Sequence, residues 1–270
     1  MPHRARKRFG QNFLHDRNVI DRIIAAIQPA DHEHLIEIGP GLGALTTPLL
    51  PRCASLTAVE IDRDIVSQLT RRFADQPKLS LIQADALHLD FQALINDSPQ
   101  AADRAARRRI VGNLPYNIAT PLLFHLFKVQ HLFADMHFML QREVVARMSA
   151  QPGAKSYGRL SVMTQYHCAA TPLFTVGPTA FRPASAVESA MIRFIPHAAS
   201  PVEVAVWEHF ATLIALAFGQ RRKTLRRIFK GRLAASDYAA LAIDPQHRPE
   251  QLDLAAFAAI SNRLSQRPAI

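Results

Sequence analysis

The stretch HLIEIGPGLGALTTPLL, residues 34–50, decides which fold we expect from this sequence. Its first part, HLIEIG, is a short apolar run that ends in glycine, which is typical of a buried strand. Its last part, ALTTPLL, begins a helix. Between the two, Gly39, Gly41 and Gly43 remove side chains where a ligand must approach the backbone. A structural turn seldom needs three glycines at alternate positions, so the stretch predicts a strand, a loop for a nucleotide-like ligand, and a helix.

Strand and helix patterns alternate on both sides of this stretch. Further strands are expected at LTAVEID (56–62), LSLIQAD (79–85), RIVGN (109–113) and MHFMLQ (136–141), and helices at VIDRIIAAI (19–27), IVSQLTRRF (65–73) and TPLLFHLF (120–127). For the last helix we expect Thr120 as the N-cap and Pro121 at the first helical position. The alternation predicts an α/β fold, in which helices cover both faces of a parallel sheet.

The C-terminal part of the chain has a different pattern. Two more expected strands, PLFTV and AMIRFI, are followed by PHAASP (196–201), which has the composition of a linker. From Val202 onward only helical patterns occur. We therefore expect a large α/β domain over residues 1–199 and a small all-α domain over residues 200–270, a division that suits a chain of 270 residues.

The charge of the chain indicates a polyanionic partner. The formal net charge is +10, and basic side chains gather in three separate segments. Such segments predict a surface that meets phosphates in several places, although a solvated helix face remains an alternative for the last one. We expect that last segment to form a helix after Gly219. The segments contain Arg4, Arg6, Lys7 and Arg8; Arg107, Arg108 and Arg109; and Arg221, Arg222, Lys223, Arg226, Arg227, Lys230 and Arg232.

Other classes of protein are disfavoured. No apolar run reaches the roughly 18–20 residues that span a bilayer, and the N-terminus lacks the apolar core of a signal peptide. Cys53 and Cys168 lie far apart, which implies no disulfide framework. His32 and His34 have no matching set of cysteines or carboxylates, so we expect no metal site. A cytoplasmic protein is the simplest interpretation.

Two acidic residues end neighbouring strands of the expected sheet. Glu60 ends the second strand, roughly 20 residues after the glycine loop, where a carboxylate could hold ribose hydroxyls. Asp85 ends the third strand and could accept a hydrogen bond from an adenine amino group, with a helix N-cap as the alternative. Gly39, Gly41 and Ala44 also satisfy the dinucleotide pattern G-x-G-x-x-G/A, so the loop alone leaves the nucleotide open.

The end of the fourth strand separates the candidate ligands. The stretch IVGNLPYNIATPLL (110–123) presents there an amide, a backbone carbonyl, a rigid ring and an aromatic ring, from Asn113, Leu114, Pro115 and Tyr116. Two hydrogen-bond acceptors and an aromatic platform suit a flat base that carries an amino group. The acceptors would hold the amino hydrogens and orient the nitrogen lone pair toward a methyl donor. A dehydrogenase would instead need a proton-handling residue at this place.

The motifs together resemble a known family. NLPY (113–116) after this glycine loop is similar to the [DNSH]-P-P-[YFW]-type motif of amino methyltransferases. With it, QNFL (11–14), VEID (59–62), QADAL (83–87), FRPASAVES (181–189) and FGQRRKTLRR (218–227) resemble the 16S rRNA adenine dimethyltransferase family over nearly the whole chain.

This resemblance implies a fold, a cofactor and a target. The fold would be a Rossmann-like methyltransferase sheet, and the cofactor would be S-adenosylmethionine. The target would be the exocyclic N6 of two adjacent adenines in a hairpin loop near the 3′ end of 16S rRNA, within the small ribosomal subunit or its precursor. The chain would act in small-subunit biogenesis as a monomer.

The resemblance also assigns roles to particular residues. Asn12, Leu14 and Gly39 would lie at the methionine end of the cofactor, Glu60 at its ribose and Asp85 at its adenine, with Gly41 in the same loop. Asn113 would lie at the reacting centre, where it would also contact the cofactor. Phe181 would sandwich the target base against Tyr116, beside Pro115. Arg221, Arg222 and Lys223 would contact RNA. The order Arg182, Pro183, Ala184, Ser185 departs from the second proline that is usual in the family here.

Alternatives from other classes remain open at this point. The chain could be an adenine methyltransferase that acts on large-subunit rRNA or DNA, because such enzymes share these motifs. It could also be a non-catalytic assembly factor that keeps the fold, or an NAD-dependent oxidoreductase, which NLPY and the positive charge disfavour.

Overall fold

The computed structural model describes residues 12–97 and 108–266, and the chain divides into two compact units. The first contains Met1–Val145 and Thr171–Pro196, and the second contains Ala146–Ala170 and His197–Ile270. The expected boundary between residues 199 and 200 lies close to the observed one after Pro196, but the second unit also contains residues 146–170. Residues 146–170 group with the C-terminal helices because α7 (Arg159–His167) packs against α8 (Trp207–Gly219) and α11 (Leu254–Ser265).

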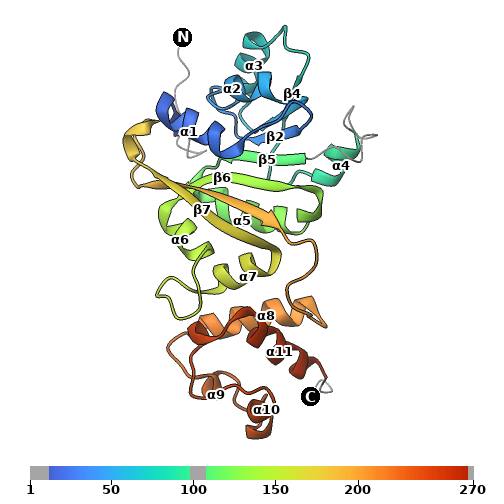
Figure 1. Ribbon diagram of the computed structural model, residues 1–270, viewed down its shortest axis with the longest axis vertical. Helices are drawn as coiled ribbons and strands as arrows, with labels where there is room; N and C mark the ends of the chain where they lie inside the picture. The colour runs from blue at the N-terminus through green and yellow to red at the C-terminus, as the bar shows by residue number, and fades with distance from the viewer. Residues whose placement is uncertain (1–11, 98–107, 267–270) are drawn as a thin grey trace. The chain divides into compact units, whose positions relative to one another are not determined.

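A seven-stranded sheet forms the centre of the first unit, in the order β4-β3-β2-β5-β6-β9-β7 (Figure 1). The first five of these strands are parallel, and β9 runs antiparallel to β6. The expected α/β fold is therefore confirmed. The strands are β2 (His34–Ile38), β3 (Ser55–Glu60), β4 (Leu79–Gln83), β5 (Arg108–Asn113), β6 (Asp135–Gln141), β7 (Cys168–Val176) and β9 (Ser189–Pro196).

Helices of the first unit alternate with these strands, and their starts have local causes. The Asp16 carboxylate accepts from the backbone N–H groups of Asn18 and Val19, and Asp62 caps the next long helix in the same way. Among the residues that the structure describes between 197 and 266, the second unit has helices and no strand, as expected. The helices not yet given bounds are α1 (Arg17–Ile27), α2 (Thr46–Leu49), α3 (Arg63–Arg72), α4 (Phe91–Asn96), α5 (Tyr116–Phe127), α6 (Arg142–Met148), α9 (Leu225–Ile228) and α10 (Ala235–Ala240).

Helix α5 begins earlier than the sequence predicts. Pro115 is its N-cap, and the Pro115 carbonyl accepts from the backbone N–H groups of Ile118 and Ala119. The expected start with Thr120 as N-cap is wrong, and Pro121 lies inside the helix, near its N-terminal end. Pro121 is the sixth residue of the helix and lies beyond its first turn, so it has no N–H to donate to the Asn117 carbonyl four residues earlier. The early start places Tyr116 as the first helical residue, directly after the strand end.

The strand order creates a crevice at the carboxyl ends of β2, β3 and β5. The chain runs from β2 outward to β3 and β4, and then returns to the other side of β2 as β5. Ile38, the last residue of β2, therefore pairs with Val59 on one side and with Gly112 on the other. A Cβ on Gly112 would lie 2.7 Å from the Ile38 carbonyl oxygen, so only glycine fits there. Ligands bind at such topological switch points in open α/β sheets.

A second, two-stranded sheet lies beside the crevice at the carboxyl ends of the strands. β1 (Phe13–Leu14) pairs antiparallel with β8 (Phe181–Arg182), so that Leu14 lies opposite Phe181. Leu14 and Phe181 both belong to the hydrophobic core beside α1 and β2. The sequence patterns do not predict this pairing, although QNFL and FRPASAVES were both singled out as motifs.

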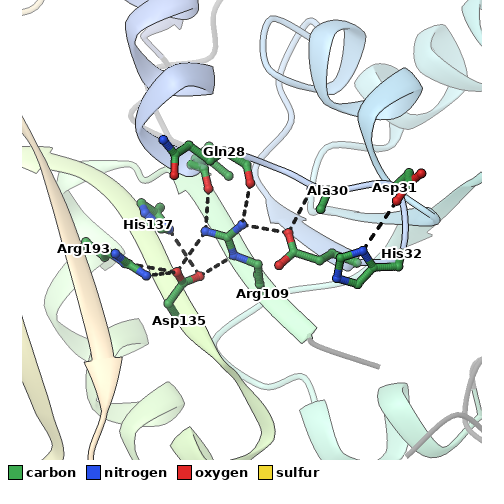
Figure 2. Close-up of polar contacts among 10 residues, drawn as sticks. Gln28, Ala30, Asp31, His32, Arg109, Asp135, His137 and Arg193 are labelled. Carbon is green, nitrogen blue, oxygen red and sulfur yellow. Dashed lines mark hydrogen bonds and ion pairs between the residues drawn. The ribbon is translucent and has the colours of Figure 1, made fainter. Parts of the chain in front are cut away.

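At the amino-terminal ends of β5 and β6, opposite the carboxyl ends that line the crevice, Arg109 lies in a buried ionic network (Figure 2). Its guanidinium donates to both carboxylate oxygens of Asp135, at 2.6 and 2.9 Å, and to Glu33 at 2.8 Å. The remaining N–H groups donate to the carbonyl oxygens of Ile27 and Gln28. The expectation that Arg109 contacts phosphates is wrong, because its side chain is satisfied inside the protein. Arg107 lies outside the described residues.

In the parts of the chain that the structure describes, no helix is both long and apolar enough to cross a bilayer.

Candidate active site

One cavity of about 260 Å³ lies at the carboxyl ends of the parallel strands. It is lined by residues that follow β2, β3, β4 and β5, and by the two short strands β1 and β8. Most residues of the first unit that the sequence analysis placed in a site line this cavity: Asn12, Leu14, Gly39, Gly41, Glu60, Asp85, Asn113, Leu114, Pro115, Tyr116 and Phe181. Gly43 is the exception, because it faces the side chains of Leu69, Arg72 and Phe73 instead.

The glycine loop has the backbone shape that glycine favours. Gly39, Gly41 and Gly43 have φ values of +67°, +54° and +82°, a region in which other residues are strained. A Cβ on Gly41 would also lie 3.1 Å from the Phe13 ring. Gly39 and Gly41 thus form a cradle of backbone beside the cavity, whereas a Cβ on Gly43 would contact the side chains of Leu69 and Arg72 on α3.

Glu60 lies at the floor of the cavity and is 6% exposed. Its carboxylate accepts from the backbone N–H of Asp62 at 3.0 Å and from that of Gly41 at 3.4 Å. Burial raises the pKa of the Glu60 carboxyl, while these backbone hydrogen bonds oppose the rise. The long contact with Gly41 links the strand-end acid directly to the glycine loop. A ligand hydroxyl could bind the same carboxylate oxygen.

Asp85 is more exposed than Glu60 and makes local contacts. Its carboxylate accepts from the backbone N–H of Leu87 at 2.9 Å and lies 3.1 Å from the ring Nδ1 of His88. The alternative interpretation, a helix N-cap, does not fit, because α4 is capped by Asp90. The His88 ring is largely exposed, so a ligand amino group could replace its contact with Asp85.

The NLPY segment lines the same cavity. The Asn113 amide Nδ2 donates to the Asn12 carbonyl at 3.2 Å, which fixes the orientation of the amide because that carbonyl can only accept. The amide oxygen Oδ1 is therefore available as an acceptor. The Leu114 N–H donates to the Met139 carbonyl at 3.2 Å, which anchors the segment to β6. Tyr116 follows at the start of α5.

The cavity also contains residues that the sequence analysis missed. Ile61, Ala86 and Leu87 each follow a strand-end acid and give the wall apolar surface, and Ile61 is 42% exposed. The position of Ile61 directly after the strand-end residue Glu60 could have indicated that it lines the cavity. Phe13, which packs against the glycine loop, was hidden inside QNFL.

Glu37 is a further missed residue, on β2 directly before the glycine loop. It is 1% exposed, lines the cavity and accepts a hydrogen bond from the Thr46 hydroxyl at 2.7 Å. Burial raises the pKa of the Glu37 carboxyl from 4.5 to about 7, although the Thr46 hydrogen bond opposes the rise. The carboxyl thus changes its charge near neutral pH.

We expect Glu37→Gln to flatten the pH dependence of stability. A buried acid whose folded pKa is raised stabilises the fold below its unfolded pKa and costs stability as pH rises through the folded pKa. The wild-type protein should therefore lose up to about 3 kcal/mol between pH 5 and 9 through this group. The variant, which has no charge to bury, should lose less over that range. Urea unfolding of both ligand-free proteins at pH 5, 7 and 9 measures this, and parallel curves would contradict it.

In the second unit, the basic segment is not the continuous helix that we expected. α8 ends at Gly219, and α9 has only the residues Leu225–Ile228. The first N–H groups of α9 donate instead to the His247 and Pro245 carbonyls, which turns the chain between the two helices. Arg222 and Lys223 are exposed on this turn. Arg221 donates to the Lys155 carbonyl at 2.8 Å and lies 3.7 Å from Glu250.

Comparison with known proteins decides the family. The model of the family described as "Ribosomal RNA adenine dimethylase" matches residues 2–266 of this chain. The chain belongs to the ribosomal RNA adenine dimethylase family. The resemblance inferred from the motifs is thereby confirmed.

Relatives of this dimethylase share about half of its residues. One from Pseudomonas putida, named ribosomal RNA small subunit methyltransferase A, is 50% identical over 98% of this chain and 97% of its own length. One from Histophilus somni with the same name is 47% identical over 98% of this chain and 94% of its own length.

Solved structures share the fold of this dimethylase. A dimethyladenosine transferase from Plasmodium falciparum has a TM-score of 0.79 at 24% identity, over 94% of this chain and 98% of that one. The 23S rRNA methyltransferase ErmE has a TM-score of 0.71 at 23% identity, over 94% of this chain and all of that one. The expected Rossmann-like sheet with a helical C-terminal region is therefore confirmed.

Proposed function

We propose that this dimethylase transfers methyl groups from S-adenosylmethionine to the exocyclic N6 of two adjacent adenines near the 3′ end of 16S rRNA. The observation that carries the proposal is the cavity, which brings together the glycine cradle, the acids Glu60 and Asp85, the NLPY segment and Phe181. The names of the relatives that are about half identical support the small subunit as the source of that RNA.

The residues around the glycine loop fit the proposed cofactor. S-adenosylmethionine, when bound, supplies an activated methyl group on a sulfonium centre. Glu60 would accept from the ribose hydroxyls, and Asp85 from the adenine amino group, between the apolar side chains of Ile61 and Leu87. Asn12 and Leu14 on the β1 arm, with Gly39 and Gly41, would enclose the methionine end.

The NLPY segment would orient the target amine. Asn113 Oδ1 and the Leu114 carbonyl would accept its two hydrogens, which points the nitrogen lone pair away from them. The same two oxygens would stabilise positive charge that develops on the nitrogen, and the proton would leave to water. Holding reactants in line can supply roughly 7–11 kcal/mol of the barrier. Tyr116 and Phe181 would stack on the extruded adenine, at roughly 1–3 kcal/mol per base.

The second unit would contribute to RNA binding through charge. Arg222 and Lys223 are exposed cations with Arg221 beside them, and they would contact phosphate oxygens, which position an RNA without specifying its sequence. We propose that the RNA is gripped here and by the basic arm from Arg4 to Arg8, which lies outside the described residues. We also propose a cytoplasmic monomer that acts on the assembled small subunit or its precursor.

Transfer of labelled methyl groups tests the proposed function. Small and large ribosomal subunits, each prepared without methyl groups at their adenine dimethylation sites, are incubated with the protein and labelled S-adenosylmethionine. Label in the small subunit alone is the expected result. Label in the large subunit alone would favour the ErmE-like alternative, and cofactor binding without transfer would favour an assembly factor.

We expect Glu60→Ala to weaken S-adenosylmethionine binding by about 10–100-fold, because hydrogen bonds to a charged acceptor contribute roughly 1.5–3 kcal/mol. Glu60→Gln keeps one acceptor oxygen and should lose less affinity. Titration calorimetry measures both variants. Unchanged affinity in the alanine variant would remove Glu60 from the cofactor site.

We expect Arg222→Ala combined with Lys223→Ala to weaken small-subunit binding and to flatten its salt dependence. Each lost phosphate contact reduces the slope of log affinity against log salt by roughly 0.7–0.9. Cofactor affinity should not change. The matched control removes two exposed arginines of α3, with Arg63→Ala and Arg71→Ala. An equal loss of slope in the control would mean that only the net charge matters.

A further inference from the structure

The loop between β8 and β9 turns a single side chain inward. Ser185 is 7% exposed, whereas the loop residues on either side of it, 182–184 and 186–188, are exposed. The Ser185 N–H donates to the Pro178 carbonyl at 3.2 Å, which holds that position of the backbone. A buried hydroxyl in an exposed loop needs partners, and its partners show what it does.

Those partners form a chain of hydroxyl groups with one direction. The Ser185 Oγ donates its only proton to the Val187 carbonyl, at 2.7 Å. It lies 2.9 Å from the Tyr116 hydroxyl, so at this contact Tyr116 must be the donor. Because the Tyr116 hydroxyl proton is used in the hydrogen bond to Ser185, the Ser189 hydroxyl, 2.7 Å away, must donate to the Tyr116 oxygen. The order is Ser189 to Tyr116 to Ser185 to Val187.

This chain holds the Tyr116 ring at both of its ends. The backbone end is the first residue of α5, which is capped by Pro115. The hydroxyl end lies between Ser189, which pairs with Gln141 in the central sheet, and Ser185 in the loop. Ser185 and Ser189 do not line the cavity, whereas Tyr116 does, so an effect of either serine on a ligand there is indirect.

We propose that Ser185 is a positioning residue for the target base, which it serves by fixing the ring of Tyr116. The proposal rests on the proposed function, because it assigns Tyr116 to the stacking of the adenine. Ser189 supplies the second, rigid point of attachment. A ring held at both its backbone end and its hydroxyl keeps the direction of its long axis, so less freedom is left to the stacked base when the amine reaches Asn113.

A double-mutant cycle separates this role from a merely structural one. The proteins are the wild type, Ser185→Ala, Tyr116→Phe and the double variant, with Ser67→Ala as a matched loss of an exposed serine hydrogen bond. At saturating small subunits and cofactor, Ser185→Ala should slow methyl transfer about 3–10-fold, as expected for one neutral hydrogen bond. Cofactor affinity and the apparent affinity for the subunit should change less than twofold.

The decisive comparison is the effect of Ser185→Ala in the Tyr116→Phe background. If Ser185 acts through the tyrosine hydroxyl, the substitution has no further effect there. The same loss in both backgrounds would overturn the proposal, because the serine would then act through the loop alone. Absence of methyl transfer by the wild type would instead contradict the proposed function.

A second measurement tests the hydroxyl contact without activity. The chain has four tyrosines, so ring-labelled protein gives four Cζ signals, and the one lost in Tyr116→Phe belongs to Tyr116. Ser185→Ala should shift that signal and leave the other three in place, whereas Ser67→Ala should shift none. An unmoved Tyr116 signal would overturn the proposal whether or not the protein is active.

Discussion

Asn113→Ala should reduce the rate of methyl transfer by about 10²–10³-fold, the loss typical when one oriented polar group is removed from a reacting centre. The Asn113 amide lies where β5 meets α5, and its Nδ2 group donates to the Asn12 carbonyl. This contact leaves Oδ1 as the acceptor that would orient the target amine. Single-turnover transfer at saturating cofactor and small subunits measures the chemical step directly.

The companion variant Asn113→Asp separates the two functions of the amide. It keeps an acceptor oxygen but cannot donate to the Asn12 carbonyl, so its rate should lie between those of the wild type and the alanine variant. Cofactor affinity should fall much less than the rate in both variants. A rate within twofold of wild type for Asn113→Ala would show that the side chain does not orient the amine.

Arg109→Ala should destabilise the first unit by about 3–5 kcal/mol, because it leaves buried carboxylates without their main partner. Asp135 is fully buried and Glu33 is 3% exposed, and each accepts a hydrogen bond from Arg109. Arg193 also forms an ion pair with Asp135, but it is more exposed, and among the described residues it makes no contact that would replace the one between Arg109 and Glu33. Arg71→Ala, which removes an exposed arginine of α3, should change stability by less than about 0.5 kcal/mol.

The loss of stability in Arg109→Ala should depend on pH. Burial by itself would raise the pKa of the Asp135 carboxyl, yet contacts with His137 and Arg109 hold it well below its ordinary value of 3.8. A lowered pKa stabilises the fold above the unfolded value and loses this effect as pH falls. Without Arg109 the Asp135 pKa rises, so the difference between the two proteins should be larger at pH 7 than at pH 4.

The measurement must distinguish the two units. Trp207 is the only tryptophan and begins α8, so its fluorescence reports on the second unit. Hydrogen exchange of peptides from β5 and β6 reports on the first. Faster exchange there with unchanged Trp207 fluorescence is expected. Equal exchange in both proteins would mean that the network contributes no net stability.

The sequence was sufficient for the features that depend on neighbouring residues. Alternating apolar runs and helical patterns predicted the parallel sheet. Glu60 and Asn113 end their strands as expected, while Gly39 and Asp85 follow the ends of theirs by one and two residues. Because the carboxyl ends of parallel strands meet at one edge, knowing the strand ends was enough to predict that these residues share a cavity. The start of α5 was predicted wrongly because the four residues of NLPY contain the end of β5, the turn after it and the first residue of the helix.

By itself, then, the sequence determined the parallel sheet, the glycine cradle and the acids and NLPY segment at its edge. Only the tertiary structure decided how distant segments complete them. Asn113 is held by a carbonyl 101 residues away, Tyr116 by a hydroxyl 69 residues away, and Arg109 by acids 26 and 76 residues away. Periodicity and composition describe a residue's neighbours along the chain, whereas burial depends on what packs against it. For that reason a run of three arginines had the pattern of a phosphate-binding surface, although its last member is enclosed in the core.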